Sequence, residues 1–524
     1  MIFHLKKSFL FFLLALLFAL GVEKAQAAVS PTVTAASMTA QGVGMGAIRI
    51  HAKIPQVVKS KDSYYYLFEV NPSDDRLVRV LGKGNKQGDN THLVFNFSCQ
   101  DDPAYVVMKY ALAVKTSKGS GLKNYTRISP AIYCSYPERA TVVATAYKRG
   151  ATKKGLQSTS IEQLLDSGSK NCFLNLNIST VLSGASSSYY YGGETYHFNP
   201  LSGYITLIRE CNARGIQVTM QLMLDSASPD NLKAGGLGSG ASHYAFNTQD
   251  PSMRKWTGAI FSYLAKLFGT DTCYVSNWIL GNEVNSAYPY YYMGQVSIEE
   301  FAANYAATFR DLYNAVKGYR GSSRVFICLE HCWNIPNQTL LAFPGKTLLS
   351  LFDQELRSLE EGIHWDLAYH AYPKDLANPA FWNDGLYDTP DTPTISPINL
   401  RTLTRYIQKA YGPDTRIILS EIGFHSGAGD TLQAAGIAMA YYIAACNPMV
   451  DAIHMRSYQD EAGDAAHGVS FGMVGHTALK VFRLMDTKDY LTATKNLLKK
   501  TVGQSWTALI PGYKASRIYS YYGG

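Results

Sequence analysis

Two glutamates of this chain, Glu283 and Glu421, each end an apolar run of the sequence. Glu283 follows the run that begins at Trp278, and Glu421 follows the run that begins at Arg416. A carboxylate at the end of a buried strand costs free energy unless it is paired or takes part in a reaction. Hydrolysis of a glycosidic bond requires two carboxyl groups flanking that bond, one as the acid and one as the carboxylate. The pair therefore predicts glycoside hydrolysis, and a structural salt bridge is the alternative for either glutamate alone.

The elements that must position these glutamates alternate between strands and helices from about residue 150 onward. Capping boxes at Ser160 with Gln163 and at Ser297 with Glu300 mark helix starts, because they satisfy free backbone N–H groups. Eight apolar runs predict strands at 155–157, 172–178, 216–225, 275–283, 324–330, 364–372, 416–421 and 450–458. Eight such units predict a (β/α)8 barrel, in which catalytic groups lie at the C-terminal ends of the strands. The alternative, an open doubly wound sheet, lacks a glycine-rich phosphate loop after its first strand.

Three of the other predicted strands also end in polar residues. Asn177, Asp225 and Glu330 stand at strand ends where a core strand would carry aliphatic side chains. Each is a candidate to bind a sugar hydroxyl, and each is equally compatible with a buried polar group that bonds only within the protein.

Several short motifs resemble a secreted bacterial family of unknown function that is related to clan A glycoside hydrolases. They lie at residues 278–284, 368–373, 391–400 and 419–424, and the resemblance extends from about 140 to 480. It implies that Glu283 is the acid/base, that Glu421 is the nucleophile and that Asn282 bonds the sugar 2-hydroxyl.

The same resemblance implies roles for two residues at the end of the sixth strand. Tyr372 would orient the nucleophile, and His370 would lie beside the same subsite. We expect retention at the anomeric carbon, with the two carboxyls about 5–5.5 Å apart. This reaction needs no cofactor or metal.

The end of the eighth strand departs from the clan A pattern. Many of those enzymes have a tryptophan there, whereas this chain has no tryptophan between His454 and Tyr458. Tyr458 is the candidate replacement as a stacking platform. Arg456 suggests an anionic or heavily hydroxylated sugar, since a guanidinium binds a carboxylate or sulfate in a bidentate manner. A structural salt bridge that closes the barrel is the alternative for Arg456.

Residues 28–137 have a different pattern from the barrel region that we assign to 138–524. Short runs alternate apolar and polar residues, as at 47–54 and 93–97, and turn-rich pieces separate them. This pattern predicts an antiparallel β-sandwich of the immunoglobulin or fibronectin kind. We interpret it as an accessory domain, and polysaccharide binding and packing against the barrel both stay open as its role.

The first 27 residues have the features of a secretory signal. Lys6 and Lys7 precede an apolar run at 9–20, and 25–27 form a small-residue cleavage site. A retained membrane anchor is the alternative. No later segment contains 18 uninterrupted apolar residues, so we expect a mature protein without a membrane span. We expect it to be secreted or extracellular, with loose cell-envelope association as a further possibility.

Composition narrows the classes of partner. The formal charge of +8 is spread along the chain without a basic block, so nucleic acid is not an expected partner. Thirty-seven tyrosines suit a polysaccharide or oligosaccharide ligand, because tyrosine combines a flat apolar face with a polar tip. The oligomeric state stays open.

Cysteine spacing bears on the redox state and on metal binding. The chain has eight cysteines, and we expect Cys99 and Cys134 to be the first candidates for a disulfide, because both fall in the small β region. Neither a CxxC pair nor an HExxH motif occurs, so no metal site is expected.

Two other classes of function compete with hydrolysis of glycosides. A non-catalytic carbohydrate-binding or cell-surface scaffold protein could use the same barrel, since a fold does not imply activity. An esterase or peptidase is disfavoured because the sequence has no Gly-x-Ser-x-Gly elbow.

Overall fold

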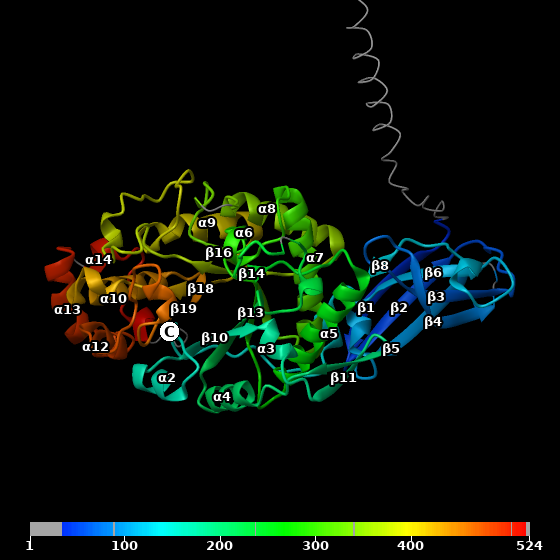
Figure 1. Ribbon diagram of the computed structural model, residues 1–524, viewed down its shortest axis with the longest axis horizontal. Coiled ribbons are helices and arrows are strands. Elements are labelled where there is room, and N and C mark those ends of the chain that lie inside the picture. Colours follow the sequence, from blue (N-terminus) through cyan, green and yellow to red (C-terminus); the bar gives the residue numbers. More distant parts are fainter. Residues whose placement is uncertain are drawn as a thin grey trace, which may run out of the picture.

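The computed structural model describes residues 34–519 except 87, 89, 236, 339, 340 and 505. The predicted signal sequence at 1–27 lies outside these residues. Figure 1 shows an elongated molecule with the N-terminal strands at one end and the helix-covered barrel beside them.

The N-terminal region consists of two antiparallel sheets. In strand β2 the side chains of Ile48, Ile50, Ala52 and Ile54 are buried and the alternate ones are exposed or half-buried, as expected for a strand with one face on a core. One sheet has the order β1 (Ser37–Gly44), β2 (Ala47–Ile54) and β5 (Thr91–Ser98). The other contains β4 (Leu77–Lys86), β3 (Tyr64–Val70), β6 (Lys109–Lys115) and β7 (Tyr125–Arg127), with β8 (Ile132–Tyr133) also paired to β6. The predicted antiparallel β region is confirmed.

Eight parallel strands form a closed barrel in the rest of the chain. They are β9 (Lys154–Gln157), β10 (Asn171–Asn177), β13 (Gln217–Asp225), β15 (Asn277–Leu280), β16 (Arg324–Glu330), β17 (Asp366–His370), β18 (Ile417–Ile422) and β19 (Val450–Met455). Each strand bonds its neighbour, and β10 pairs with both β9 and β13, so the ring closes. The predicted (β/α)8 barrel is confirmed.

Helices cover the outside of the barrel (Figure 1). The side chains of Ser160 and Ser297 accept hydrogen bonds from the backbone N–H of Gln163 and Glu300, so both predicted N-caps are present. The main helices are α2 (Ile161–Ser167), α4 (Ser202–Ala213), α5 (Pro251–Leu267), α7 (Ile298–Tyr319), α8 (Gly345–Leu359), α9 (Leu400–Tyr411), α10 (Asp430–Cys446), α12 (Thr477–Leu484) and α13 (Tyr490–Thr501). Shorter elements are α3 (Ile178–Leu182), α6 (Ala287–Tyr290), α11 (Ala462–Ala465), α14 (Trp506–Leu509), α15 (Ser516–Tyr519), β11 (Ser187–Tyr191), β12 (Glu194–Phe198) and β14 (His243–Tyr244). No helix within the described part of the chain is long and apolar enough to cross a membrane.

The N-terminal sheets join the barrel through buried polar groups of α7. Arg310, which has no exposed surface, donates from Nη1 to the carbonyl of Val107 at 2.8 Å and from Nε to Glu360 at 2.8 Å. Asn314 donates to the carbonyl of Val106 at 2.9 Å. These bonds hold the N-terminal region against the barrel. The boundary that we predict between residues 137 and 138 falls between β8 and β9, and the role of the N-terminal region stays a prediction.

The candidate disulfide between Cys99 and Cys134 does not form. All eight cysteines are buried and free. Cys99 follows β5 in one sheet and Cys134 follows β8 at the other, and burial raises the pKa of the Cys99 thiol to about 12. Both residues pack as small apolar groups rather than forming a bridge.

Candidate active site

Glu283 lies in a tight turn at the C-terminal end of β15. The strand ends at Leu280, earlier than the predicted 283, and the turn begins at Gly281 with a φ of 72°. A Cβ at Gly281 would lie 2.7 Å from the Tyr291 ring, so this position requires glycine. Glu283 itself has a φ of 42°, a left-handed conformation that costs a non-glycine residue about 1–3 kcal/mol and is common at functional sites. The turn thereby places the Glu283 carboxyl over the end of the barrel.

Glu421 reaches the same face from β18. Its strand is buried throughout, from Ile417 to Ile422. Tyr372 donates from its hydroxyl to Glu421 Oε1 at 2.7 Å, and Arg456 Nη1 lies 3.1 Å from Glu421 Oε2. Burial opposes ionisation of Glu421, but the positive charges of His370 and Arg456 and these hydrogen bonds hold its pKa below the ordinary value. Glu421 is therefore a carboxylate near neutral pH.

The two glutamates face one another across His370. One carboxylate oxygen of each glutamate and one His370 nitrogen all lie within 4.8 Å of one another. His370 Nδ1 is 2.7 Å from Glu283 Oε1. Burial disfavours the imidazolium, but the Cys328 thiol and the Glu421 and Glu283 carboxyls beside it raise the pKa of His370 well above its ordinary value. The structure thus brings together four of the five site residues that we predict at the ends of the fourth, sixth and seventh strands, namely Glu283, His370, Tyr372 and Glu421.

Asn282 is held by a residue that the sequence analysis missed. Gln221 of β13 donates from Nε2 to Asn282 Oδ1 at 2.8 Å. This bond occupies the carbonyl of the Asn282 side chain and leaves its NH2 group as the donor for a ligand. A glutamine within the apolar run 216–225 was the available signal.

Arg456 is enclosed by carboxylates. Its Nε and Nη2 lie 3.1 and 2.8 Å from the two oxygens of Asp464, and Nη2 lies 3.6 Å from Glu461 Oε2. With Glu421 on Nη1, three carboxylates share one guanidinium. Of the two interpretations of Arg456, this geometry favours the internal salt bridge over recognition of an anionic sugar. Glu461 is the N-cap residue of the short helix α11 after β19 and Asp464 lies within that helix, and sequence reasoning did not find them.

Asp225 and Asn177 lie at the ends of the neighbouring strands β13 and β10. Asp225 Oδ1 accepts from the Ser179 N–H at 3.0 Å and from the Ser228 hydroxyl at 2.7 Å, and Oδ2 accepts from the Ser179 hydroxyl at 2.6 Å. Asp225 therefore ties β13 to α3. Asn177 Oδ1 is buried and has no hydrogen-bond partner among the described residues.

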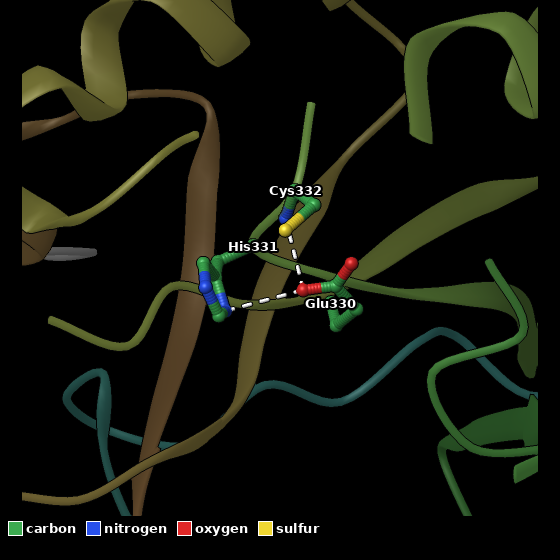
Figure 2. Close-up of side chains that lie close together, drawn as sticks. All are labelled: Glu330, His331 and Cys332. Atoms are coloured by element: carbon green, nitrogen blue, oxygen red, sulfur yellow. Dashed lines mark hydrogen bonds and ion pairs between the residues drawn. The ribbon is translucent and has the colours of Figure 1, made fainter. Parts of the chain in front are cut away.

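Glu330 forms a compact group with His331 and Cys332 at the end of β16. Figure 2 shows the His331 ring and the Cys332 backbone converging on the Glu330 carboxyl. Glu330 Oε2 accepts from the Cys332 N–H at 2.9 Å and lies 3.2 Å from His331 Nδ1. Glu330 Oε1 accepts from Asn285 at 2.9 Å, so Glu330 supports the segment that follows Glu283. Burial raises the pKa of Glu330.

Tyrosines form part of the wall of the site. Burial, together with the carboxyls of Glu283 and Glu421, raises the pKa of Tyr290 to about 12. Tyr458 lines a pocket beside β19, and its hydroxyl donates to Asp166 at 2.6 Å. Tyr290, in the segment after β15, therefore adjoins the carboxyl pair.

Within the described part of the chain, two groups contain side chains of metal-ligating type, namely Glu283 with His370 and Glu421, and Glu330 with His331 and Cys332. In the first group the Arg456 guanidinium lies 3.1 Å from Glu421, where its positive charge opposes a divalent cation. In the second group the Glu330 oxygens already accept internal hydrogen bonds.

Comparison with known protein families identifies the family to which the barrel belongs. Residues 146–509 match a family of unknown function, DUF5722. The chain belongs to this family. The match covers the barrel and leaves out β1 to β8, and no curated protein matches this DUF5722 member.

Several solved structures resemble this DUF5722 chain weakly. A calcium-binding mutant of β-glucuronidase 2 from Bacteroides uniformis is 9% identical with a TM-score of 0.39, and the match covers 87% of this chain and 50% of that one. An FMN-binding β-glucuronidase from Facaelibacterium prausnitzii L2-6 is 11% identical with a TM-score of 0.33, and the match covers 86% of this chain and 61% of that one. A β-glucosidase from Thermotoga maritima in complex with glucoimidazole is 16% identical with a TM-score of 0.39, over 60% and 79%. The chain spans about half the length of the first of these proteins.

Proposed function

We propose that the protein is an exported glycoside hydrolase that cleaves an oligosaccharide or polysaccharide with retention at the anomeric carbon. The observation that carries the proposal is the facing pair Glu283 and Glu421, with carboxylate oxygens within 4.8 Å. Retaining glycosidases have their carboxyls about 5–5.5 Å apart, whereas inverting enzymes need about 6.5–9.5 Å to fit a water molecule. The short separation supports retention.

The surroundings of the two carboxyls suit different roles. Glu421 has a lowered pKa and accepts a hydrogen bond from Tyr372, so it suits the ionised nucleophile. The Glu283 carboxyl contacts His370 Nδ1 at 2.7 Å and has 15% of its side chain exposed, so it can exchange a proton with a leaving group or water.

The reaction would proceed in two displacements. In the first, a Glu421 oxygen attacks the anomeric carbon, the bond to the leaving oxygen breaks, and Glu283 gives that oxygen its proton. In the second, Glu283 takes a proton from water, the water oxygen bonds to the anomeric carbon, and Glu421 leaves as a carboxylate. Each cycle restores both groups and consumes one water molecule.

Export is the part of the proposal that rests on sequence alone, namely the signal-like segment 1–27. We further propose release outside the cell or loose retention on the envelope. Signal removal is tested by N-terminal sequencing of protein recovered from the medium and from cell fractions.

The experiment that tests hydrolysis is sugar release from a polysaccharide and aryl-glycoside panel. Wild type, Glu421→Gln and Glu283→Gln are compared with the control Glu299→Gln, which removes an exposed carboxylate in the first turn of α7. We expect wild type and control to cleave a substrate and the two site variants to lose activity by at least about a thousandfold. Proton NMR of the first anomer formed then tests retention. If all four proteins bind a glycan and none cleaves it, a binding or scaffold protein is the correct interpretation.

A further inference from the structure

A pocket of about 320 Å³ lies towards the C-terminal ends of β9, β10 and β19, the face of the barrel that carries the carboxyl pair. Its lining includes Gln157, Asn175, Tyr458 and Glu461. Glu461 lies 3.6 Å from Arg456 Nη2, and the same guanidinium lies 3.1 Å from Glu421. Arg456 therefore contacts both a residue of the pocket wall and the proposed nucleophile.

Two residues that line this pocket each carry a buried side-chain carbonyl oxygen without a hydrogen-bond partner among the described residues, and each amide must turn toward the pocket for that oxygen to meet a ligand. Gln157 Oε1 and Asn175 Oδ1 are buried and accept no hydrogen bond from any described residue. Leaving a buried acceptor unsatisfied costs about 1–3 kcal/mol, so such atoms are rare in folded proteins. An amide oxygen accepts hydrogen bonds and cannot donate them. The ligand that relieves this cost must bring donors such as hydroxyl groups.

Two further buried carbonyl oxygens lie on the neighbouring strands β10 and β13. Asn177 Oδ1 and Gln221 Oε1 are also buried without a partner among the described residues. Asn175 and Gln221 are register partners on the adjacent strands β10 and β13. Gln221 in turn bonds Asn282, next to Glu283. The acceptors therefore run from the pocket towards the acid/base residue.

The charges around the pocket are unfavourable for an anion. No lysine, arginine or histidine is among the residues that line it. Two guanidiniums lie next to lining residues, and both already pair with carboxylates. Arg456 contacts Glu421, Glu461 and Asp464, and Arg483, beside Tyr458, contacts Asp166 at 2.7 Å. A sugar carboxylate or sulfate would lie close to Glu461 without a cation left to pair with it, which is costly in a partly buried site.

We infer that this pocket is a subsite for an uncharged, hydroxyl-rich sugar residue, whose hydroxyls donate to Gln157 and Asn175, and that it discriminates against uronic acids and sulfated sugars. The inference rests on the proposed hydrolase function and adds the substrate class.

The test compares matched neutral and acidic substrates on the full chain. The probes are 4-nitrophenyl glucosides and galactosides of both anomers and the corresponding glucuronides and galacturonides. We expect kcat/KM for the best neutral glycoside to exceed that of its uronide by at least about 30-fold. Equal or better cleavage of the uronide would overturn the inference and leave the hydrolase proposal standing.

Variants of the pocket test the contacts. Gln157→Leu and Asn175→Leu should each raise KM about 5- to 30-fold, since a lost hydrogen bond in a buried site is worth about 1–2 kcal/mol. Gln408→Leu, the same change at an exposed position of α9, is the control and should behave as wild type. Unchanged KM in both pocket variants, with melting temperatures equal to wild type, would contradict the assignment. Glu461→Gln should narrow the gap between neutral and acidic substrates.

A binding measurement separates this inference from the proposed reaction. Saturation-transfer NMR on Glu421→Gln uses cello-oligosaccharides, galacto-oligosaccharides and oligogalacturonides as ligands. If no glycoside is cleaved, the hydrolase proposal fails, and binding of neutral but not acidic oligosaccharides still supports the subsite. Binding of oligogalacturonides alone overturns it.

Discussion

Replacing Tyr372 by phenylalanine isolates one hydrogen bond to the proposed nucleophile. The Tyr372 hydroxyl donates to Glu421 Oε1 at 2.7 Å, and the tyrosine side chain is buried. Burial and the Glu421 charge raise the pKa of Tyr372 well above 10, so it remains a donor throughout the pH range of an assay. The variant removes this donor and keeps the ring.

The magnitude follows from the strength of a hydrogen bond to a charged group. Such a bond is worth about 1.5–3 kcal/mol, and one pKa unit corresponds to about 1.4 kcal/mol. Loss of the bond destabilises the ionised form of Glu421 and should raise its pKa by about 1–2 units. Because the nucleophile must be ionised, activity is lost as pH falls through this pKa. The acidic limb of the pH profile should therefore move up by about 1–2 units.

The assay is the pH dependence of kcat/KM on an aryl glycoside, which reports the free enzyme. Tyr369→Phe is the matched control, because Tyr369 is a buried tyrosine of β17, the strand that precedes Tyr372, and its hydroxyl donates to the His331 carbonyl at 3.1 Å. The control should keep the acidic limb of the wild type. If Tyr372→Phe is folded and the acidic limb of its pH profile stays where it is in the wild type, the assignment of Glu421 as the ionised nucleophile is refuted.

Three further perturbations test other parts of the structure. Gly423→Ala places a Cβ 2.6 Å from the ring of Phe471, whose packing partner is the Tyr372 ring, so we expect kcat/KM to fall at least about tenfold. Arg310→Met leaves Glu360 buried without its cation and should lower the free energy of unfolding by about 3–5 kcal/mol in urea titrations, with kcat of the folded protein unchanged. A thiol reductant should leave the melting temperature within about 1 °C, because the cysteines are free.

Each of these has a control or a contrary outcome. For Gly423→Ala, an unchanged pH profile and kcat/KM would mean that Phe471 does not transmit strain to Tyr372. For Arg310→Met, the control is Arg357→Met, which breaks an exposed pair with Asp353 and should cost less than about 1 kcal/mol. A melting temperature that falls by several degrees with reductant would indicate a disulfide in the folded protein.

The barrel was predictable because its strands are buried on both faces and therefore are continuous apolar runs. The run 416–421 matches β18 to within one residue. The run 275–283 overestimates β15, because Gly281 starts a turn that apolar composition does not reveal. The run 450–458 likewise extends past Met455, where β19 ends. Composition alone does not mark the residue at which a buried strand leaves the sheet.

The proposed catalytic residues were predictable for a geometric reason. In a barrel all strand ends meet at one face, so Glu283, His370 and Glu421 had to be neighbours once the strands were assigned. Glu461 and Asp464 were not predictable, since their contact with Arg456 depends on the path of a loop. The sequence could not decide whether Cys99 and Cys134 form a disulfide, because the presence of two cysteines in one small domain does not specify the direction of their side chains.

The hydrogen bonds between α7 and the N-terminal region affect which substitutions the N-terminal region can accept during evolution. Arg310 and Asn314 recognise the main-chain carbonyls of Val107 and Val106, and every residue type carries such a carbonyl. Substitution at these two valines leaves the acceptors in place, provided that the backbone keeps its course. The barrel thus constrains the shape of its neighbour rather than its residue types, and the N-terminal region is free to acquire a new surface while remaining attached.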